Sequence, residues 1–281
     1  MGLYLEGHRY CLLTSENLLD WTILQELEIN NEGECPDITC YELDGKKYWV
    51  IIGASDYYVV GVFEDGKFVV LTKERKLTYS PSRFSYAAQS YSGIDDGRNI
   101  RMIWDKINMP SKRTPHQMSV PMELRLVKCR NDLLLTSFPA DEIKQMYVGT
   151  DHRENFSLEE SISYPLMRAA YDIQLQAEYG VPIQIEWFGH TIRLNTEDNC
   201  VEFQKHKFPI SVDQKSIDLR IVIDRCSIEI FSDAGKYSAT YLALCDYNVP
   251  YLTISAKDTV RIDSLSVSKL KSIYVGEENR K

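Results

Sequence analysis

The sequence predicts an all-β protein of two domains. Helix signals are nearly absent from its 281 residues, and short apolar or alternating runs bounded by Gly, Asp, Asn and Pro dominate, which is the pattern of antiparallel strands and their turns. The Asp-Gly pairs at residues 44–45 and 65–66 stand between such runs and predict tight hairpins. A chain of this length is ample for two domains of about 100–200 residues each.

Residues 1–140 are predicted to form antiparallel meanders. One strand is expected over residues 47–52, and residues 59–63 and 68–71 are expected to pair across the second Asp-Gly turn. Hairpin turns only about 20 residues apart are typical of propeller blades. Because a four-stranded blade needs about 40–50 residues, this segment has room for about three blades.

The composition changes near Pro139, where the second domain is predicted to begin. Residues 139–147 combine early acidic residues with apolar spacing suited to one short linker helix. The predicted domains are therefore residues 1–140 and residues 141–281. In the second, strands recur at intervals of about 8–12 residues, as in a β-sandwich. Examples are residues 183–188, 191–194, 219–223, 227–231 and 252–256.

The charge balance argues against two classes of partner. With a net charge of −9 and a pI near 5.2, the chain lacks the concentrated positive charge that nucleic acids and anionic membranes attract. No apolar run approaches the roughly 18 residues of a transmembrane helix. A neutral carbohydrate partner is compatible with this balance.

Neither a metal nor a nucleotide cofactor is predicted. The seven cysteines form no CxxC pair, the five histidines show no paired metal spacing, and no GxGxxG or P-loop segment occurs. Several cysteines lie inside apolar strand patterns, where a free thiol behaves as a small buried apolar group. Because the N-terminus also lacks the features of a secretory signal, the pattern favours a reducing, cytoplasmic location.

The motif Glu34-Cys35-Pro36-Asp37 is the most informative segment of the chain. It follows the run Ser-Glu-Asn-Leu-Leu-Asp-Trp at residues 15–21. Pro36 fixes its own φ and biases Cys35 towards an extended conformation. We therefore expect a rigid segment that holds the Glu34 side chain in one direction.

In that setting the motif resembles the acid/base segment of glycoside hydrolase family 32, the β-fructosidases that include invertases and levanases. Five further segments resemble the family in the same order, at residues 57–68, 86–89, 97–104, 118–124 and 223–231. Two departures stand out. Ile103 occupies a position where Gly is usual, and no acidic residue occurs in residues 80–85, ahead of Tyr86.

The resemblance implies a five-bladed β-propeller followed by a β-sandwich. Family members carry a nucleophilic Asp in a Trp-Met-Asn-Asp-Pro-Asn-Gly segment and a stabilising Asp in an Arg-Asp-Pro segment, both before the acid/base motif. Only 33 residues precede Glu34, and neither segment is among them. The chain thus resembles an N-terminally truncated fructosidase with a partial propeller. Open blade edges then predict a homo-oligomer, or association with a chain that completes the propeller.

The resemblance also implies roles for individual residues. The catalytic acid/base would be Glu34, and the substrate-binding residues would be Asp37, Tyr86, Gln89 and Trp104. The aromatic rings would stack on sugar faces, and the amide would bond sugar hydroxyl groups. Judged from the residues alone, Glu34 and Asp37 can also be solvated loop residues. The rings of Tyr86 and Trp104 can also belong to a core.

Other charged residues leave the chemistry open. No replacement nucleophile can be named, and Asp105, directly after Trp104, is expected on the opposite face of its strand. In the second domain, Asp224, Arg225 and Glu229 are either structural ion pairs around a hairpin or a set that grips sugar hydroxyl groups.

Two functions follow as alternatives. The first is a β-fructosidase that hydrolyses sucrose or fructans by a retaining two-carboxylate mechanism. Its activity would be weak or absent unless a partner chain supplies the two missing segments. The second is a non-catalytic carbohydrate-binding or structural derivative of the enzyme. Either would need no cofactor.

Overall fold

The computed structural model describes residues 2–6, 9–81, 84–108, 115–211 and 215–273. These residues fall into two compact units. Unit 1 contains most of the first 140 residues, and unit 2 contains residues from Asp141 onward. Two short segments of the first 140 residues, including Tyr79–Pro81, group with unit 2.

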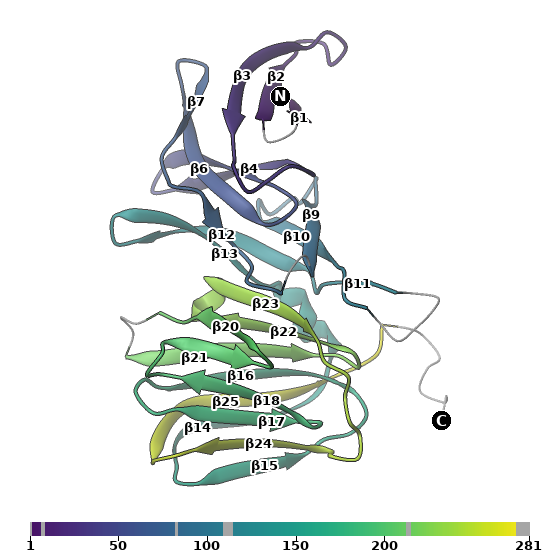
Figure 1. Ribbon diagram of the computed structural model, residues 1–281, viewed down its shortest axis with the longest axis vertical. Coiled ribbons are helices and arrows are strands. Elements are labelled where there is room, and N and C mark those ends of the chain that lie inside the picture. The colour runs from purple at the N-terminus through teal and green to yellow at the C-terminus, as the bar shows by residue number, and fades with distance from the viewer. Residues whose placement is uncertain (1, 7–8, 82–83, 109–114, 212–214, 274–281) are drawn as a thin grey trace. The chain divides into compact units, whose positions relative to one another are not determined.

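Unit 1 consists of three antiparallel sheets (Figure 1). The first joins β1 (Gly2–Glu6), β2 (Arg9–Thr14) and β3 (Thr22–Glu28). The second joins β4 (Asp37–Leu43), β5 (Lys46–Ile52), β6 (Tyr57–Glu64) and β7 (Lys67–Val70), with β8 (Arg75–Lys76) beside β6. The third joins β11 (Gln117–Met118), β10 (Asn99–Asp105), β12 (Met122–Cys129) and β13 (Asp132–Pro139), with β9 (Ser85–Ser90) beside β10. The predicted blade-like meanders are confirmed.

The two predicted Asp-Gly hairpins have the backbone geometry that their residues favour. Asp44 and Gly45 have φ angles of 51° and 72°, and Asp65 and Gly66 have φ angles of 47° and 75°. Two successive positive φ angles define a type I′ turn, whose twist matches that of the flanking strands. Leu43 accordingly pairs with Lys46 directly across the first turn.

The second sheet of unit 1 is covered on both faces. Val50 and Ile51 are neighbours on β5, so their side chains point to opposite faces, and both are fully buried. Val50 packs in a cluster with Leu124 and Leu135 of the third sheet. Ile51 packs in a separate cluster with Tyr10 of the first sheet. Blade-on-blade burial therefore explains the continuous apolar run of β5.

A buried ion pair links the second and third sheets of unit 1. Arg101 on β10 donates from Nη1 and Nη2 to the two carboxylate oxygens of Asp56, at 2.9 and 3.1 Å. Thr78 donates a further hydrogen bond to Asp56 at 2.8 Å. Both charged side chains are almost completely buried. A two-pronged pair of this kind keeps the buried charges satisfied, so its role is structural.

Unit 2 begins with a 3-10 helix, η1 (Asp141–Met146), where the sequence predicts a short helix. Two six-stranded antiparallel sheets follow. One contains β14 (Tyr147–Leu158), β25 (Val260–Leu270), β16 (Ala170–Glu178), β21 (Ser216–Ile223), β22 (Ser227–Ser232) and β23 (Tyr237–Leu242). The other contains β15 (Ser161–Pro165), β24 (Tyr251–Ala256), β17 (Ile183–Trp187), β18 (His190–Asn195), β19 (Cys200–Phe203) and β20 (His206–Pro209).

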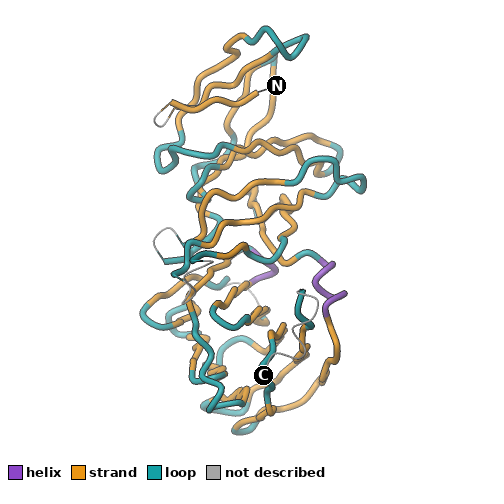
Figure 2. The backbone as a smooth tube through the Cα atoms, turned by 90° about the vertical axis from the view of Figure 1, so that its right-hand side faces the viewer, coloured by secondary structure: helices purple, strands orange, loops and turns teal. Residues whose placement is uncertain are grey.

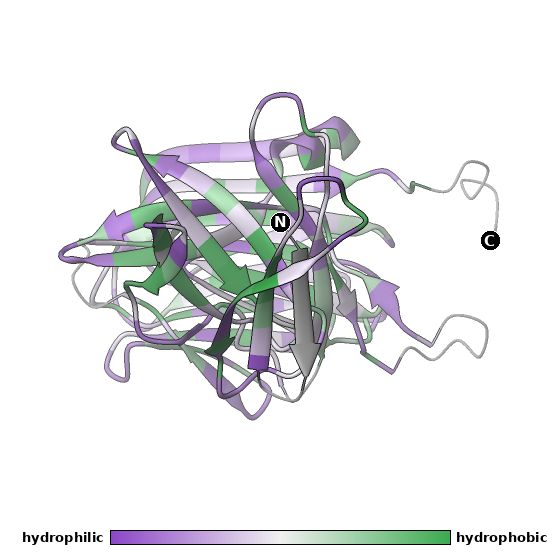
Figure 3. Ribbon diagram, turned by 90° about the horizontal axis from the view of Figure 1, so that it is seen from above, coloured by the Kyte–Doolittle hydropathy of each residue, from purple (hydrophilic) through white to green (hydrophobic). Residues whose placement is uncertain are grey.

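The core of unit 2 lies between its two sheets. Ile173 and Ile221 from one sheet pack in the same cluster as Ile185, Trp187 and Phe203 from the other. Side chains that alternate inward along each strand build such a core, and the predicted β-sandwich is confirmed. Figure 3 shows apolar residues along the strands and polar residues at most turns. Helices are confined to short segments (Figure 2), and in the described part of the chain none is long and apolar enough to cross a membrane.

Candidate active site

Glu34 lies in the loop between β3 and β4 of unit 1, and its side chain is exposed. The backbone of this loop is held in place, because the Ala54 N–H donates a hydrogen bond to the Glu34 carbonyl oxygen at 2.9 Å. Cys35 has a φ angle of 45°, in the left-handed region, and not the extended conformation expected before Pro36. Contacts of the loop with the turn after β5 override the local preference.

Glu32, two residues before Glu34, is buried, with 1% of its surface exposed. Its two carboxyl oxygens accept backbone N–H groups of Ser55 at 2.9 Å and Tyr57 at 2.6 Å. Burial raises the pKa of Glu32 to about 7, and the charges of Asp56 and Glu74 also raise it, whereas the two backbone hydrogen bonds lower it. Desolvation outweighs the hydrogen bonds because it disfavours the charged form directly.

A bulge in β9 decides which side chains face outward together. Tyr86 pairs with Trp104 and Gln89 pairs with Met102, so two residues of β9 lie opposite the single residue Ile103. Ala87, inside the bulge, has a φ angle of 50°. In a regular strand, residues three apart point to opposite faces. The extra residue restores the phase, so Tyr86 and Gln89 share the face that carries Trp104.

Glu34, Tyr86 and Trp104 form one cluster. The Tyr86 hydroxyl group donates a hydrogen bond to Oε2 of Glu34. The centroid of the Tyr86 ring lies 6.5 Å from that of Trp104, with 58° between the ring planes. Tyr86 is 5% exposed, whereas Trp104 is 38% exposed. The cluster thus combines an accessible carboxyl group with an accessible aromatic face.

Lys106 and His116 extend this cluster. The Lys106 Nζ atom lies 3.8 Å from the centroid of the Tyr86 ring and 4.6 Å from that of Trp104. His116 makes an edge-to-face contact with Trp104, with 5.4 Å between the ring centroids. A cation over two rings is attracted by their negative faces. The two rings of Tyr86 and Trp104, which form the aromatic platform of the site, therefore have a positive charge over them.

Asp37 and Gln89 are joined to the cluster through the backbone of β9. Oδ2 of Asp37 accepts the N–H of Ser90 at 3.0 Å, which fixes the start of β4 against the end of β9. Gln89 is exposed, and its Nε2 donates to the carbonyl oxygen of Ala88 at 3.0 Å. Gln89 therefore offers an outward-facing amide beside the cluster. Asp37 holds the backbone of β9 in place.

Sequence reasoning placed Asp105 correctly but missed three residues. Asp105 is fully buried on the face opposite to Trp104. Lys106 stands two residues beyond Trp104, and strand alternation was the signal that could have found it. His116 and Glu32 had no such signal. Ser82 and Arg83, in the acid-free segment before Tyr86, lie outside the described residues.

A cluster of possible metal ligands in unit 2 is already filled by a lysine. Asp198, Cys200 and Glu202 each place one ligand atom within 4.8 Å of the others. The Lys207 Nζ atom lies 2.9 Å from Asp198 and 2.8 Å from Glu202. The position between the two carboxylates is thus occupied by an ammonium group, so the cluster is an ion-pair network.

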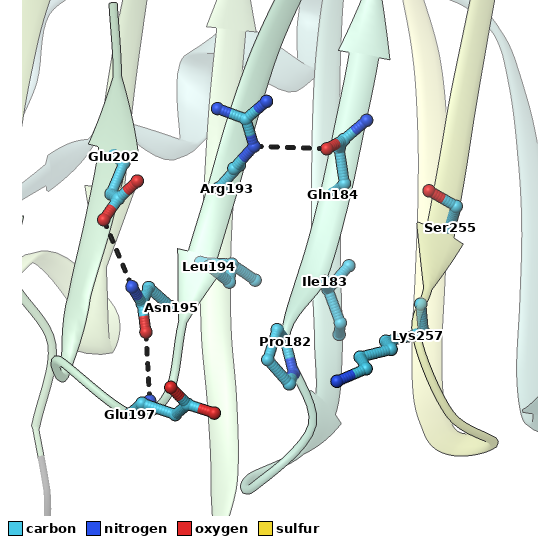
Figure 4. Close-up of a pocket in the computed structure, with 11 residues that line it drawn as sticks. Pro182, Ile183, Gln184, Arg193, Leu194, Asn195, Glu197, Glu202, Ser255 and Lys257 are labelled. Carbon is cyan, nitrogen blue, oxygen red and sulfur yellow. Dashed lines mark hydrogen bonds between the residues drawn. The ribbon is translucent and has the colours of Figure 1, made fainter. Parts of the chain in front are cut away.

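A shallow hollow of about 390 Å³ lies on the outer face of the second sheet of unit 2 (Figure 4). The Arg193 Nε–H donates to Oε1 of Gln184 at 3.2 Å, and Asn195 donates to Glu202 at 3.2 Å. Figure 4 shows these hydrogen bonds between side chains of neighbouring strands. They satisfy one another, as polar residues on a solvated sheet face do, and the hollow contains no residue of the Glu34 cluster.

Comparison with known proteins finds relatives of low sequence identity. No family model matches the chain. A levanase of Bacillus sp. (strain L7) is 22% identical, with 97% of this chain and 35% of the levanase aligned. A levanase of Bacillus subtilis (strain 168) is 24% identical, with 95% of this chain and 48% of the levanase aligned. The chain therefore spans about a third to a half of these relatives.

A solved structure agrees with these relatives. The crystal structure of exo-inulinase from Aspergillus awamori superposes with a TM-score of 0.77 and 16% identity over 96% of this chain and 64% of that one. The chain is thus similar in sequence to levanases and shares the fold of the exo-inulinase. The all-β fold predicted from the sequence, with blade-like sheets in unit 1 and a sandwich in unit 2, is confirmed.

Proposed function

We propose that unit 1 carries the acid/base side of a β-fructosidase site, with Glu34 as the general acid/base. The observation that carries this proposal is the hydrogen bond from the Tyr86 hydroxyl group to the exposed Glu34 carboxyl group, beside the exposed face of Trp104. The relatives named levanase and exo-inulinase support a fructan or sucrose as the ligand.

The geometry suits Glu34 to proton transfer. A retaining glycosidase needs a carboxylic acid that protonates the leaving oxygen and then activates water. Glu34 is open to a sugar, and the Tyr86 hydroxyl group orients one of its oxygens while the other stays available. Backbone anchoring through Ala54 prevents the loop from carrying the carboxyl group away.

The same mechanism needs a second carboxylate about 5–5.5 Å from the first. The 281 residues contain neither a Trp-Met-Asn-Asp-Pro-Asn-Gly segment nor an Arg-Asp-Pro segment. Asp37 is engaged with the backbone of Ser90. Because general acid help alone contributes about 10²–10⁴-fold, we expect this chain by itself to hydrolyse sucrose or fructans weakly or not at all. A partner chain that supplied both segments would restore turnover.

Binding of fructose units does not need the second carboxylate. Trp104 offers a ring face on which sugar C–H groups stack, and Gln89 offers an exposed amide for hydroxyl groups. Lys106 adds a hydrogen-bond donor over the Tyr86 and Trp104 rings. We expect affinity for fructose units to persist in the chain as it stands.

The second candidate is a non-catalytic carbohydrate-binding derivative. Absence of both carboxylate segments from the 281 residues favours it. It shares the binding platform with the first candidate and differs only in turnover. Hydrolysis, and not binding, therefore separates the two.

The test combines calorimetric titration of the 281-residue chain with an assay of fructose release, using sucrose and short fructans. We expect measurable binding and fructose release near background. The affinity should be about tenfold lower in Trp104→Ala, because that variant loses the ring on which sugar C–H groups would stack. Trp21→Ala is the matched control, since Trp21 is 40% exposed in the same unit.

Two results would overturn parts of this proposal. Absence of binding in the unaltered chain, or equal affinity in the Trp104→Ala and Trp21→Ala variants, would remove the carbohydrate site. Robust fructose release that disappears in Glu34→Gln would establish an active enzyme and rule out the non-catalytic candidate. Fructose release at the same low level in Glu34→Gln would support it.

A further inference from the structure

We propose that Glu32 is a positioning residue for Glu34, because its buried carboxyl group ties the Glu34 loop to the turn between β5 and β6. The role of Glu34 rests on the function proposed above. The tie itself rests on contacts within unit 1, between residues 23 and 25 positions apart in sequence.

The first link is the two-pronged hydrogen bond of Glu32. One carboxyl oxygen accepts the N–H of Ser55 and the other accepts the N–H of Tyr57. Ser55 lies in the turn between β5 and β6, and Tyr57 is the first residue of β6. A buried carboxyl group costs free energy unless its hydrogen bonds are made, so Glu32 and the turn hold each other in one arrangement.

The second link runs from that turn to Glu34 and to its partner Tyr86. Ala54, next to Ser55, donates its N–H to the carbonyl oxygen of Glu34 at 2.9 Å. The carbonyl oxygen of Ala54 accepts the N–H of Ala87 at 2.9 Å. Ala87 is the bulge residue next to Tyr86, whose hydroxyl group bonds Glu34. One residue of the turn, Ala54, therefore fixes the backbone beside both the acid and its orienting hydroxyl group.

The third link is the close packing over Gly53. A Cβ atom added at Gly53 would lie 2.5 Å from the hydroxyl oxygen of Tyr10 and 2.6 Å from the carboxyl group of Glu32. Both groups thus close over the same face of Gly53, and only glycine leaves room for them. Tyr10 is fully buried on β2. The first sheet therefore packs over Glu32 and confines it against Gly53.

Acidic groups and a tyrosine lie around Glu32. Asp56 in the turn and Glu74 between β7 and β8 are acidic, and Tyr10 faces Glu32 from β2. Asp56 is paired with Arg101. Glu74 holds the start of the same loop, where its Oε2 accepts the N–H of Asn30 at 2.8 Å. The backbone amides of Ser55 and Tyr57 are the groups through which Glu32 holds the turn and the start of β6.

Substitution of Glu32 breaks the tie in a graded way. In Glu32→Gln, one N–H of the turn would face an amide donor instead of an oxygen, and in Glu32→Asp the shorter side chain cannot reach both amides. Val62→Ala is the matched control, because Val62 is buried in β6 but belongs to the cluster on the other face of the sheet. It lowers stability without touching the turn.

The experiment measures hydrogen exchange of residues 30–36, 53–57 and 85–90 by mass spectrometry, together with affinity for a short fructan. We expect exchange in all three segments to be at least about tenfold faster in Glu32→Gln, with a smaller increase in Glu32→Asp and none in Val62→Ala. Fructan affinity should fall about fivefold in Glu32→Gln and stay unchanged in Val62→Ala.

Three outcomes separate this inference from the proposed function. Unchanged local exchange in both Glu32 variants would overturn the tie, whatever the protein binds. Faster exchange with unaltered fructan affinity would reduce Glu32 to a structural residue and overturn the positioning role. Failure of the unaltered chain to bind fructan would instead count against the proposed function, and the exchange result would still decide the tie.

Discussion

Glu32 and Glu34 stand two positions apart and meet opposite environments. Glu34 is exposed beside an aromatic ring, whereas Glu32 is 1% exposed and accepts two backbone N–H groups. Their chemical roles separate for this reason. An exposed carboxyl group can reach a sugar, but a carboxyl group closed off by Tyr10 and Gly53 cannot attack one. Glu32 is therefore unsuited to the role of a nucleophile.

The raised pKa of Glu32 predicts a pH-dependent stability of unit 1. Below the ordinary glutamate value of 4.5, Glu32 is protonated in both the folded and unfolded states and carries no penalty. As the pH rises from there to about 7, the unfolded state loses its proton more readily than the folded state. The free energy of unfolding then falls by up to roughly 3 kcal/mol.

Urea unfolding at pH 5 and pH 8, at one ionic strength, checks this prediction. The chain should be less stable at the higher pH, and Glu32→Gln should remove most of that difference because glutamine does not titrate. Other carboxyl groups contribute equally to both proteins, so the comparison isolates Glu32. An identical pH dependence in the two proteins would contradict the prediction.

At the scale of the element, β9 shows how one extra residue assembles a site. Tyr86 and Gln89 share a face only because a bulge at Ala87 shifts the alternation. The positive φ of Ala87 costs an L-residue about 1–2 kcal/mol, and the Ala54–Ala87 hydrogen bond offsets part of this strain. Ala87 is thus a strained backbone position that brings Tyr86 and Gln89 onto one face of β9.

Substitutions at Ala87 test the bulge. We expect Ala87→Gly to leave stability equal or raise it by up to about 1 kcal/mol, since glycine adopts positive φ without penalty. Ala87→Val should lower stability by roughly 1–3 kcal/mol, because a β-branched residue disfavours this conformation. Thermal unfolding measures both.

The neighbouring alanine supplies the control for that series. Ala88 is buried and has no positive φ, so Ala88→Gly should destabilise by about 0.5–1 kcal/mol. Equal effects of glycine at positions 87 and 88 would show that the bulge is not strained. Fructan affinity should survive Ala87→Gly and fall in Ala87→Val.

At the scale of the whole molecule, unit 1 exposes apolar side chains that a closed fold would cover. Leu18, Leu19 and Ile23 are 72%, 83% and 63% exposed. β1 is also the outermost strand of its sheet, and an unpaired strand edge invites another chain. These features predict self-association through unit 1, or association with a chain that supplies further blades.

Light scattering at micromolar concentrations checks the association. We expect a mass above that of one chain, and a shift towards the monomer in the double variant Leu19→Lys, Ile23→Lys, because two buried charges would oppose the contact. Ile273→Lys is the control, since Ile273 is 73% exposed in unit 2. A single monomeric species for the unaltered chain would refute the prediction.

Much of the fold followed from patterns that are local in sequence. The Asp-Gly pairs predicted the two hairpins correctly, because two residues that accept positive φ favour such tight turns. Alternation predicted that Asp105 faces away from Trp104, and the motifs predicted the similarity to levanases. The role of Glu34 in catalysis and the roles of Asp37, Tyr86, Gln89 and Trp104 in binding stay predictions.

Only the tertiary structure decided how the site is built. The partner of Glu34 lies 52 residues away, and the amides that hold Glu32 lie 23 and 25 residues away. Pro36 favours an extended Cys35. In the structure, Cys35 instead has a positive φ angle, next to the hydrogen bond between the Ala54 N–H and the Glu34 carbonyl oxygen. A sequence specifies turns and alternation through neighbouring residues, whereas burial and hydrogen-bond partners depend on segments that meet only when the sheets pack.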